Sequence, residues 1–172
     1  MKVNRIFKLS CVIVVMTKEL TPLERLQLIV PGYRGYKAKD LIRQDDFLIR
    51  SSVKMKLENT LNKIAELEAQ IVSTSPFSPE LKKLEFLASK IRTLISEMVA
   101  SQGGGADVYA RYKITTEALD EIVKNDLNLI SIADQIYNDI SSGKVDSIDF
   151  MLNQLRDIMV KRQELFFPPE YR

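Results

Sequence analysis

The segment TEALDEIVKNDLNLISIADQIYNDIS, residues 116–141, indicates the fold class of the chain. Its core-type positions advance by alternate steps of three and four residues: Leu119, Ile122, Asp126, Leu129, Ala133, Ile136 and Ile140. Steps of this size place side chains along one face of an α-helix, whereas a strand would repeat every two residues. The segment therefore predicts a helix with a coiled-coil-like apolar seam and one acidic interruption, at Asp126.

Similar spacing extends outward along the chain on both sides of this segment. Apolar residues recur at helical steps between residues 57 and 71, between 81 and 98, and between 148 and 166. Two helix starts are marked, by a capping-box pattern at Thr21-Pro22-Leu23-Glu24 and by an N-cap followed by proline at Ser78-Pro79. We expect helices near residues 21–30, 38–73, 79–101, 116–141 and 146–166.

The connections between these helices predict their arrangement. The break at residues 75–78 is short, so the helices on either side should fold back on each other. Gly103-Gly104-Gly105 divides the chain into two such pairs, and we expect this loop to be among the most mobile internal segments. The predicted fold is all-α, an elongated bundle of about five helices built from two antiparallel helical hairpins.

The residue types that the chain lacks exclude several kinds of site. Among 172 residues there is no His, and the single Cys is Cys11. Ser-His-Asp and Cys-His catalysis, imidazole metal ligation and Cys-rich zinc sites therefore have no residues to form them. We expect a protein that is not an enzyme, with no catalytic residues, no cofactor and no metal site, and a cysteine count that fits the reducing cytoplasm.

The N-terminal residues MKVNRIFKLSCVIVVM combine three cations with an apolar run from Leu9. The run is about eight residues long, too short to cross a bilayer, and no A-x-A cleavage site follows it. Two interpretations stay open: a gene start assigned too far upstream, with Met16 as the first residue, or an apolar arm or short strand docked on the bundle. We expect an apolar extension at 1–15 and a single helical domain at 16–172, without a transmembrane helix.

The net charge of +2 hides a difference between the two parts of the chain. Residues 1–100 hold 17 basic and 11 acidic residues, a net charge of +6, and residues 101–172 hold 8 and 12, a net charge of −4. Either the two hairpins attract each other, or a basic surface faces nucleic acid or an anionic membrane. The pairs Asp45-Asp46 and Asp120-Glu121 could hold magnesium, but such pairs usually lie on solvated helix faces.

The segment from Val30 to Arg50 carries the candidate interaction residues: Tyr33, Arg34, Tyr36, Lys37, Lys39, Arg43 and Arg50. Tyrosine rings alternate here with cations, as contact with bases, phosphates or a partner helix requires. Four charged residues advance by four, three and four positions and so share one helix face: Lys39, Arg43, Asp46 and Arg50. The segment is either a solvated, salt-bridged face beside a helix-entry turn, or a recognition loop.

The turn Pro31-Gly32-Tyr33-Arg34-Gly35-Tyr36 ends the first helix and reverses the chain. We expect Gly32 and Gly35 to adopt backbone angles that are unfavourable for other residues, and at least one tyrosine ring to cover the junction. The aromatic, proline-rich tail at 166–172 should either fold back on the bundle or act as a short linear motif.

Pro31-Gly32, Gly35-Tyr36-Lys37 and Lys39-Asp40 resemble the PG-x-x-GYK-x-K-[ED] signature of an uncharacterised family of small helical proteins in archaea and bacteria. The likeness covers the turn and the helix entry as far as Arg50, and Gln44 and Phe47 depart from it where an acidic and a basic residue are expected. It implies that the turn is the feature that the family shares. It brings no activity, ligand or cofactor.

These observations predict a non-enzymatic helical interaction or scaffold protein, which presents a helix face to a protein partner or to a second copy. The alternative is a nucleic-acid- or ribosome-binding protein that uses the basic turn at 31–50. In that case affinity would fall steeply with salt, and joint replacement of Arg34, Lys37 and Lys39 by Ala would weaken binding to any nucleic-acid sequence. A membrane surface is a third kind of partner for the basic half.

Overall fold

The computed structural model describes residues 20–33, 39–100 and 116–165, and of residues 39–43 and 116 it describes the backbone alone. Its helices are α1 (Pro22–Ile29), α2 (Lys39–Thr74), α3 (Pro79–Ala100), α5 (Thr116–Ser141) and α6 (Ile148–Leu165). The described part of the chain contains no strand. Every predicted helix is present, with ends within two residues of the expected ones, so the all-α prediction is confirmed.

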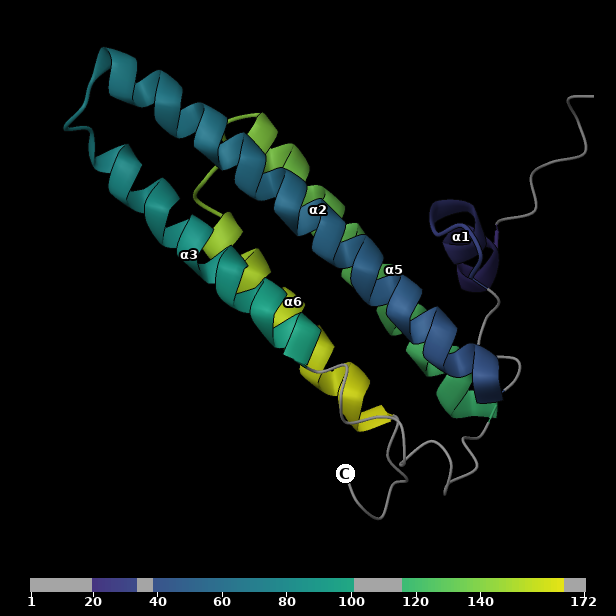
Figure 1. The fold of residues 1–172 in the computed structure, drawn as a ribbon. Coiled ribbons are helices and arrows are strands. Elements are labelled where there is room, and N and C mark those ends of the chain that lie inside the picture. Colours follow the sequence, from purple (N-terminus) through teal and green to yellow (C-terminus); the bar gives the residue numbers. More distant parts are fainter. Residues whose placement is uncertain (1–19, 34–38, 101–115, 166–172) are drawn as a thin grey trace, which may run out of the picture.

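Four of these helices form an elongated bundle of two antiparallel hairpins (Figure 1). α2 and α3 make one hairpin, α5 and α6 make the other, and both hairpins turn at the same end of the bundle. The hairpins pack side by side, so that α2 contacts α5 and α3 contacts α6. As a result α2 runs parallel to α5, and α3 runs parallel to α6. The predicted pair of hairpins is confirmed.

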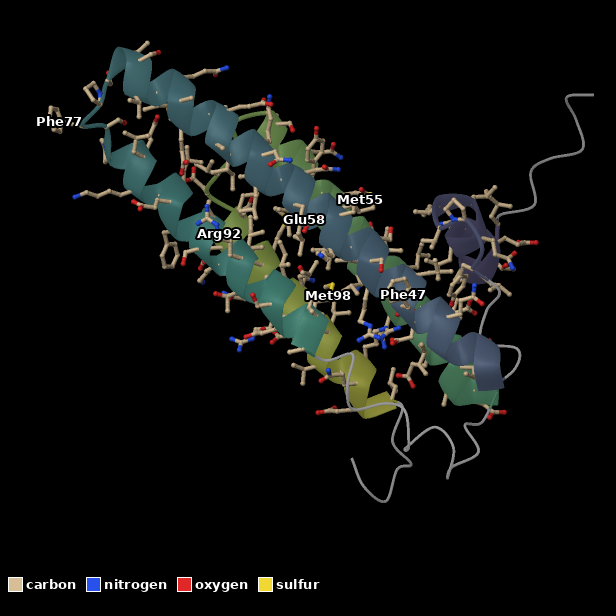
Figure 2. All side chains as sticks on the ribbon, viewed as in Figure 1. Phe47, Met55, Glu58, Phe77, Arg92 and Met98 are labelled. Carbon is tan, nitrogen blue, oxygen red and sulfur yellow. The ribbon has the colours of Figure 1, made fainter. Side chains whose placement is uncertain are left out.

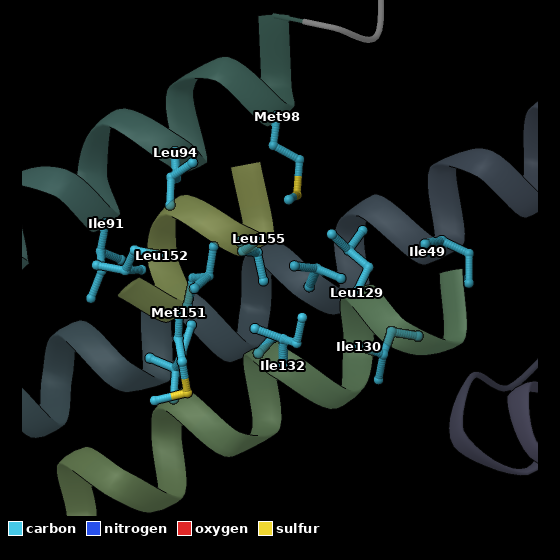
Figure 3. Close-up of a cluster of buried hydrophobic side chains, with 14 of the residues drawn as sticks. Ile49, Ile91, Leu94, Met98, Leu129, Ile130, Ile132, Met151, Leu152 and Leu155 are labelled. Carbon is cyan, nitrogen blue, oxygen red and sulfur yellow. The ribbon is translucent and has the colours of Figure 1, made fainter. Parts of the chain in front are cut away.

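The predicted apolar stripes meet between the four helices (Figure 3). Met98 of α3, Leu129 of α5 and Leu155 of α6 point toward one another and are buried. Buried members of the α5 seam are Ile122, Asp126, Leu129, Ala133, Ile136 and Ile140. Each fully buried aliphatic side chain contributes about 1.5–3 kcal/mol, so this interior supplies most of the stabilisation of the bundle.

Two predicted helix starts are capped as the sequence indicated. In α1 the backbone N–H of Glu24 donates to Oγ1 of Thr21 (3.3 Å), and the N–H of Thr21 donates to Oε2 of Glu24 (2.7 Å). In α3 the N–H of Glu80 donates to Oγ of Ser78 (3.3 Å). These bonds satisfy amide groups that the first turn of a helix leaves without partners. The capping box and the N-cap are both confirmed.

A Schellman motif ends α5 and directs the chain toward α6. The N–H of Lys144 donates to the carbonyl oxygen of Asp139 (2.8 Å), and that of Gly143 donates to the carbonyl oxygen of Ile140 (3.0 Å). Gly143 has a φ of +76°, in the left-handed region that this motif requires and glycine adopts most readily. The expected end of this helix near residue 141 is confirmed.

The turn after α1 is held against the bundle by buried side chains. Leu26, Val30 and Tyr33 are all buried, with Tyr33 only 4% exposed. Gly32 has a φ of +88°, as expected for a glycine that reverses the chain. At least one tyrosine ring therefore covers the junction, as predicted, and α1 is anchored through one of its faces.

Several expectations concern residues outside the described part of the chain. They include the extension at 1–15, the backbone of Gly35, the position of Tyr36, the loop at Gly103–Gly105 and the tail at 166–172. Among the described helices, none combines the length and the apolar character needed to cross a bilayer.

We expect Gly32→Ala to lower the free energy of unfolding by about 1–2 kcal/mol, because a left-handed backbone is strained for an L-residue. The added Cβ would lie 3.6 Å from Cδ1 of Leu48, an ordinary van der Waals distance, so a clash is not the cause. Gly143→Ala, where a Cβ meets nothing within 4 Å, should show a similar loss. Gly32→Asn should lose less, since asparagine tolerates this region. Urea unfolding measures all three; parent-like stability of Gly32→Ala would contradict the argument.

Candidate interaction site

Arg162 lies on the core face of α6 and binds carboxylates from two other helices. Its Nη1 donates to Oδ1 of Asp46 in α2 at 2.6 Å, and its Nε donates to Oδ1 of Asp126 in α5. A single guanidinium group therefore connects three of the four bundle helices. The contact lies near the end of the bundle at which α2 and α5 begin.

Arg50 joins this contact from α2. Its Nη2 donates to Oδ2 of Asp46, and its Nε donates to the backbone carbonyl oxygen of Asp46 at 3.4 Å. The Asp46–Arg50 pair is one that the residue spacing predicted. Each carboxylate oxygen of Asp46 thus accepts a hydrogen bond from a different guanidinium group. We call these four residues the charge cluster: Asp46, Arg50, Asp126 and Arg162.

The charge cluster lies inside the protein. The exposed fractions are 0% for Asp126, 5% for Arg162 and 8% for Asp46. Removing a charge from water costs several kcal/mol, and the loss is offset only where opposite charges are close and hydrogen-bonded. The cluster satisfies this condition only when α2, α5 and α6 are in one mutual position. We predict that its main effect is to restrict how these helices pack, more than to add net stability.

The burial of the charge cluster corrects part of the sequence prediction. The prediction that Asp46 and Arg50 lie on a solvated helix face is wrong. Asp46 lies three residues before Ile49 and seven before Val53, on the core face of α2. Asp45 is buried as well, so the Asp45-Asp46 pair is not on a solvated face. The apolar residues that follow in α2 turn these carboxylates inward.

Arg162 itself was absent from the sequence prediction, although a signal for it exists. It lies seven residues after Leu155, which is a core position of α6. Arginine is rarely buried without a partner, so an arginine at a core position predicts a buried carboxylate opposite it. Asp126, the acidic interruption of the α5 seam, is that carboxylate.

The structure describes the side chains of two of the predicted interaction residues, and both are directed inward. Tyr33 is buried at the junction of α1 with the bundle, and Arg50 binds Asp46. The structure does not describe Arg34, Tyr36 and Lys37, and it describes only the backbone of Lys39 and Arg43. A recognition surface formed by these five residues stays a prediction.

The acidic pairs considered for magnesium are not brought together. Asp120 and Glu121 are exposed on α5, whereas Asp45 and Asp46 are buried on α2. Across the side chains that the structure describes, no three potential ligands cluster in a way that could hold a metal ion.

Three of the four partly or largely exposed ion pairs that the structure describes between the hairpins follow the charge difference between the two parts of the chain. The cation comes from the first hairpin and the carboxylate from the second in Lys56–Asp134, Lys83–Asp146 and Lys90–Asp149. The reverse holds for Arg156–Glu97, at 2.7 Å. These pairs are partly or largely exposed, so each contributes at most about 1 kcal/mol. Attraction between the hairpins therefore accounts for part of the charge pattern.

The Lys83–Asp146 pair shows the limited strength of these surface contacts. The Lys83 ammonium hydrogen-bonds the carboxylate and lowers the pKa of Asp146 below its usual value. A carboxyl group whose pKa is lower in the folded than in the unfolded state stabilises the folded state when the pH is above the unfolded-state pKa. This stabilisation is lost as the pH falls through the folded-state pKa. Because the Asp146 side chain is almost entirely exposed, solvent screens the interaction and leaves little effect on stability.

A groove of about 670 Å³ runs between α1 and α5, outside the four-helix bundle. The α1 side is lined by Pro22, Arg25, Leu28 and Ile29, and the α5 side by Lys124, Leu127, Asn128, Ile130, Ser131 and Asp134. Leu28 is 73% exposed and Ile29 is 42% exposed, although both are large and apolar. We call this feature the α1–α5 groove.

Comparison of the chain with protein-family models, with curated proteins and with solved structures gives no match. The function must therefore be inferred from the residues of the chain itself.

We expect Arg162→Met to lower the free energy of unfolding by about 3–5 kcal/mol, because it leaves Asp126 buried without this cation. Asp126→Leu together with Arg162→Met should recover much of this loss, since Asp46 keeps Arg50 and no carboxylate remains at position 126. Chemical denaturation of the two single variants and the double variant measures the coupling.

A matched control on the same helix is Arg156→Met. Arg156 pairs with Glu97 at an exposed site, so its replacement should change the stability by no more than about 1 kcal/mol. Equal losses for Arg156→Met and Arg162→Met, or strictly additive losses for Asp126→Leu and Arg162→Met, would show that the charge cluster does not act as a unit.

Proposed function

We propose that the protein is a non-enzymatic helical interaction protein in which the bundle holds α1 in place and so forms a partner-binding groove. The observation that carries this proposal is the α1–α5 groove, where Leu28 and Ile29 are exposed beside the apolar side chains of α5. Its volume is about 670 Å³, and it is open to solvent. Exposed apolar walls of this kind are typical of surfaces that a partner covers.

The way in which α1 is attached supports this role. Leu26 and Val30, four residues apart on one face of the helix, are buried against the bundle. Leu28 lies on a different face and is not needed for that contact. A helix that served only to cover the bundle would be expected to carry polar residues on its outer faces. Leucine at position 28 is better explained by contact with another molecule.

The pairing of the cations favours a protein partner over nucleic acid. Most described cations between residues 44 and 100 bind carboxylates of the same chain: Arg50, Lys54, Lys56, Lys63, Lys83 and Lys90. Lys82 and Arg92 are the two others in that range. A phosphate would have to compete with these carboxylates for the cations. Binding of nucleic acid through the turn at 31–50 is the alternative prediction, and a mobility shift at low salt tests it.

We expect Leu28→Asp to abolish partner capture without unfolding the protein. The side chain is largely exposed, so its replacement costs the fold little, whereas a carboxylate in an apolar contact weakens binding strongly. The test compares proteins recovered from an extract of the source cells by the parent chain and by the variant, with quantitative mass spectrometry as the readout.

Val72→Asp is the matched control, because Val72 is also an exposed apolar residue but lies near the far end of α2. It should retain the partners that Leu28→Asp loses. If both variants recover the same proteins as the parent, the groove is not the binding site. Light scattering over a range of concentrations shows whether a second copy of the chain is the partner, in which case Leu28→Asp alone would give a monomer.

A further inference from the structure

We propose that the α1–α5 groove binds an acidic amphipathic helix of a partner protein, with Arg25 and Lys124 contacting its carboxylates. This inference rests on the proposed function and adds the chemistry of the partner. Three features of the groove carry it: its charge, its length and the kind of apolar side chain that lines it.

The charge of the groove favours an acidic partner. Arg25 on α1 and Lys124 on α5 are both exposed, and neither forms an ion pair with the described residues. Of the described lining residues, Asp134 alone carries a carboxylate, and it already binds Lys56 of α2. Two exposed cations therefore lie on opposite walls of the groove, and neither is in an ion pair among the residues that the structure describes. Complementary charges at the rim of an interface steer association and select the partner.

The length and shape of the groove favour a helix. The α5 lining runs from Lys124 to Asp134, about 15 Å along the axis or three helical turns. Its residues recur at steps of three and four, so the lining is one continuous face of α5. A third helix laid between α1 and α5 would place its own apolar residues at matching steps against this face.

The apolar lining is aliphatic, which argues against a nucleic acid. Leu28, Ile29, Leu127 and Ile130 form it, and among the described residues no aromatic side chain lines the groove for a base to stack on. Aliphatic side chains match the leucine or isoleucine face of an amphipathic helix. Residues 1–16 of this chain contain three cations and no carboxylate, so their charge does not complement Arg25 and Lys124 in the groove.

The test selects peptides from a random 16-residue library on the immobilised full-length chain, followed by fluorescence anisotropy of the selected peptides. We expect them to combine aspartate or glutamate with leucine or isoleucine at steps of three and four. Their affinity should fall as salt rises from about 50 to 500 mM, because screening weakens contacts between exposed charges.

Arg25→Glu together with Lys124→Glu should weaken the selected peptides by about ten-fold or more, because two attractive contacts become repulsive. The matched control is Lys82→Glu with Arg92→Glu on α3, whose side chains are also exposed and lie outside the groove (Figure 2 labels Arg92). This control makes the same change in net charge and should alter the affinity by less than about two-fold if the effect is local.

The outcomes separate this inference from the proposed function. If the selected peptides are neutral or basic but do not bind the Leu28→Asp variant, the inference of an acidic partner is overturned. The groove itself is then still a binding site. Peptides that are insensitive to Leu28→Asp, or no selected peptides at all, would overturn both. Displacement of the peptides by a single-stranded RNA of 16 nucleotides at 150 mM salt would also overturn the inference.

Discussion

The guanidinium group of Arg162, held between Asp46 and Asp126, is the interaction on which the arrangement of the bundle depends. Apolar stripes attract one another without direction, and helices that carry them can slide or rotate at little cost. A buried arginine cannot, because any displacement leaves a charge in a medium that does not solvate it. The charge cluster thus selects one packing of α2, α5 and α6 from the several that hydrophobic burial alone would permit.

The position of α1 follows from this packing. α1 contacts α5, and its buried residues Leu26 and Val30 need the surface that the assembled bundle offers. Leu28 and Ile29 become one wall of a groove only because α5 lies beside them. The groove is therefore a property of the folded chain, although every residue in it lies on a helix that the sequence predicts.

The distribution of charge has two distinct consequences. Lys56, Lys83 and Lys90 form ion pairs between the hairpins, and these pairs account for part of the charge difference between the two parts of the chain. Arg25 and Lys124 take no part in these contacts and remain beside the apolar groove. Counting charges along the sequence cannot distinguish these two groups of cations, because pairing depends on which helices are neighbours.

The sequence by itself determined the helices and their ends. Spacing of three and four residues identified the buried faces of α3 and α5, and Thr21, Ser78 and Gly143 act within a few residues of their own positions. These features depend on local geometry, which the sequence contains directly.

Only the tertiary structure decided what covers each face. Asp126 could be recognised as an interruption of a seam, but its partner Arg162 lies 36 residues away on another helix. The sequence correctly predicted that Asp46 and Arg50 pair along α2, but wrongly predicted that both face solvent. The spacing of residues within one helix does not show which of its faces another helix will cover. The α1–α5 groove was not predicted for the same reason. It arises from two helices about 100 residues apart in sequence, and burial is decided by their contact in space.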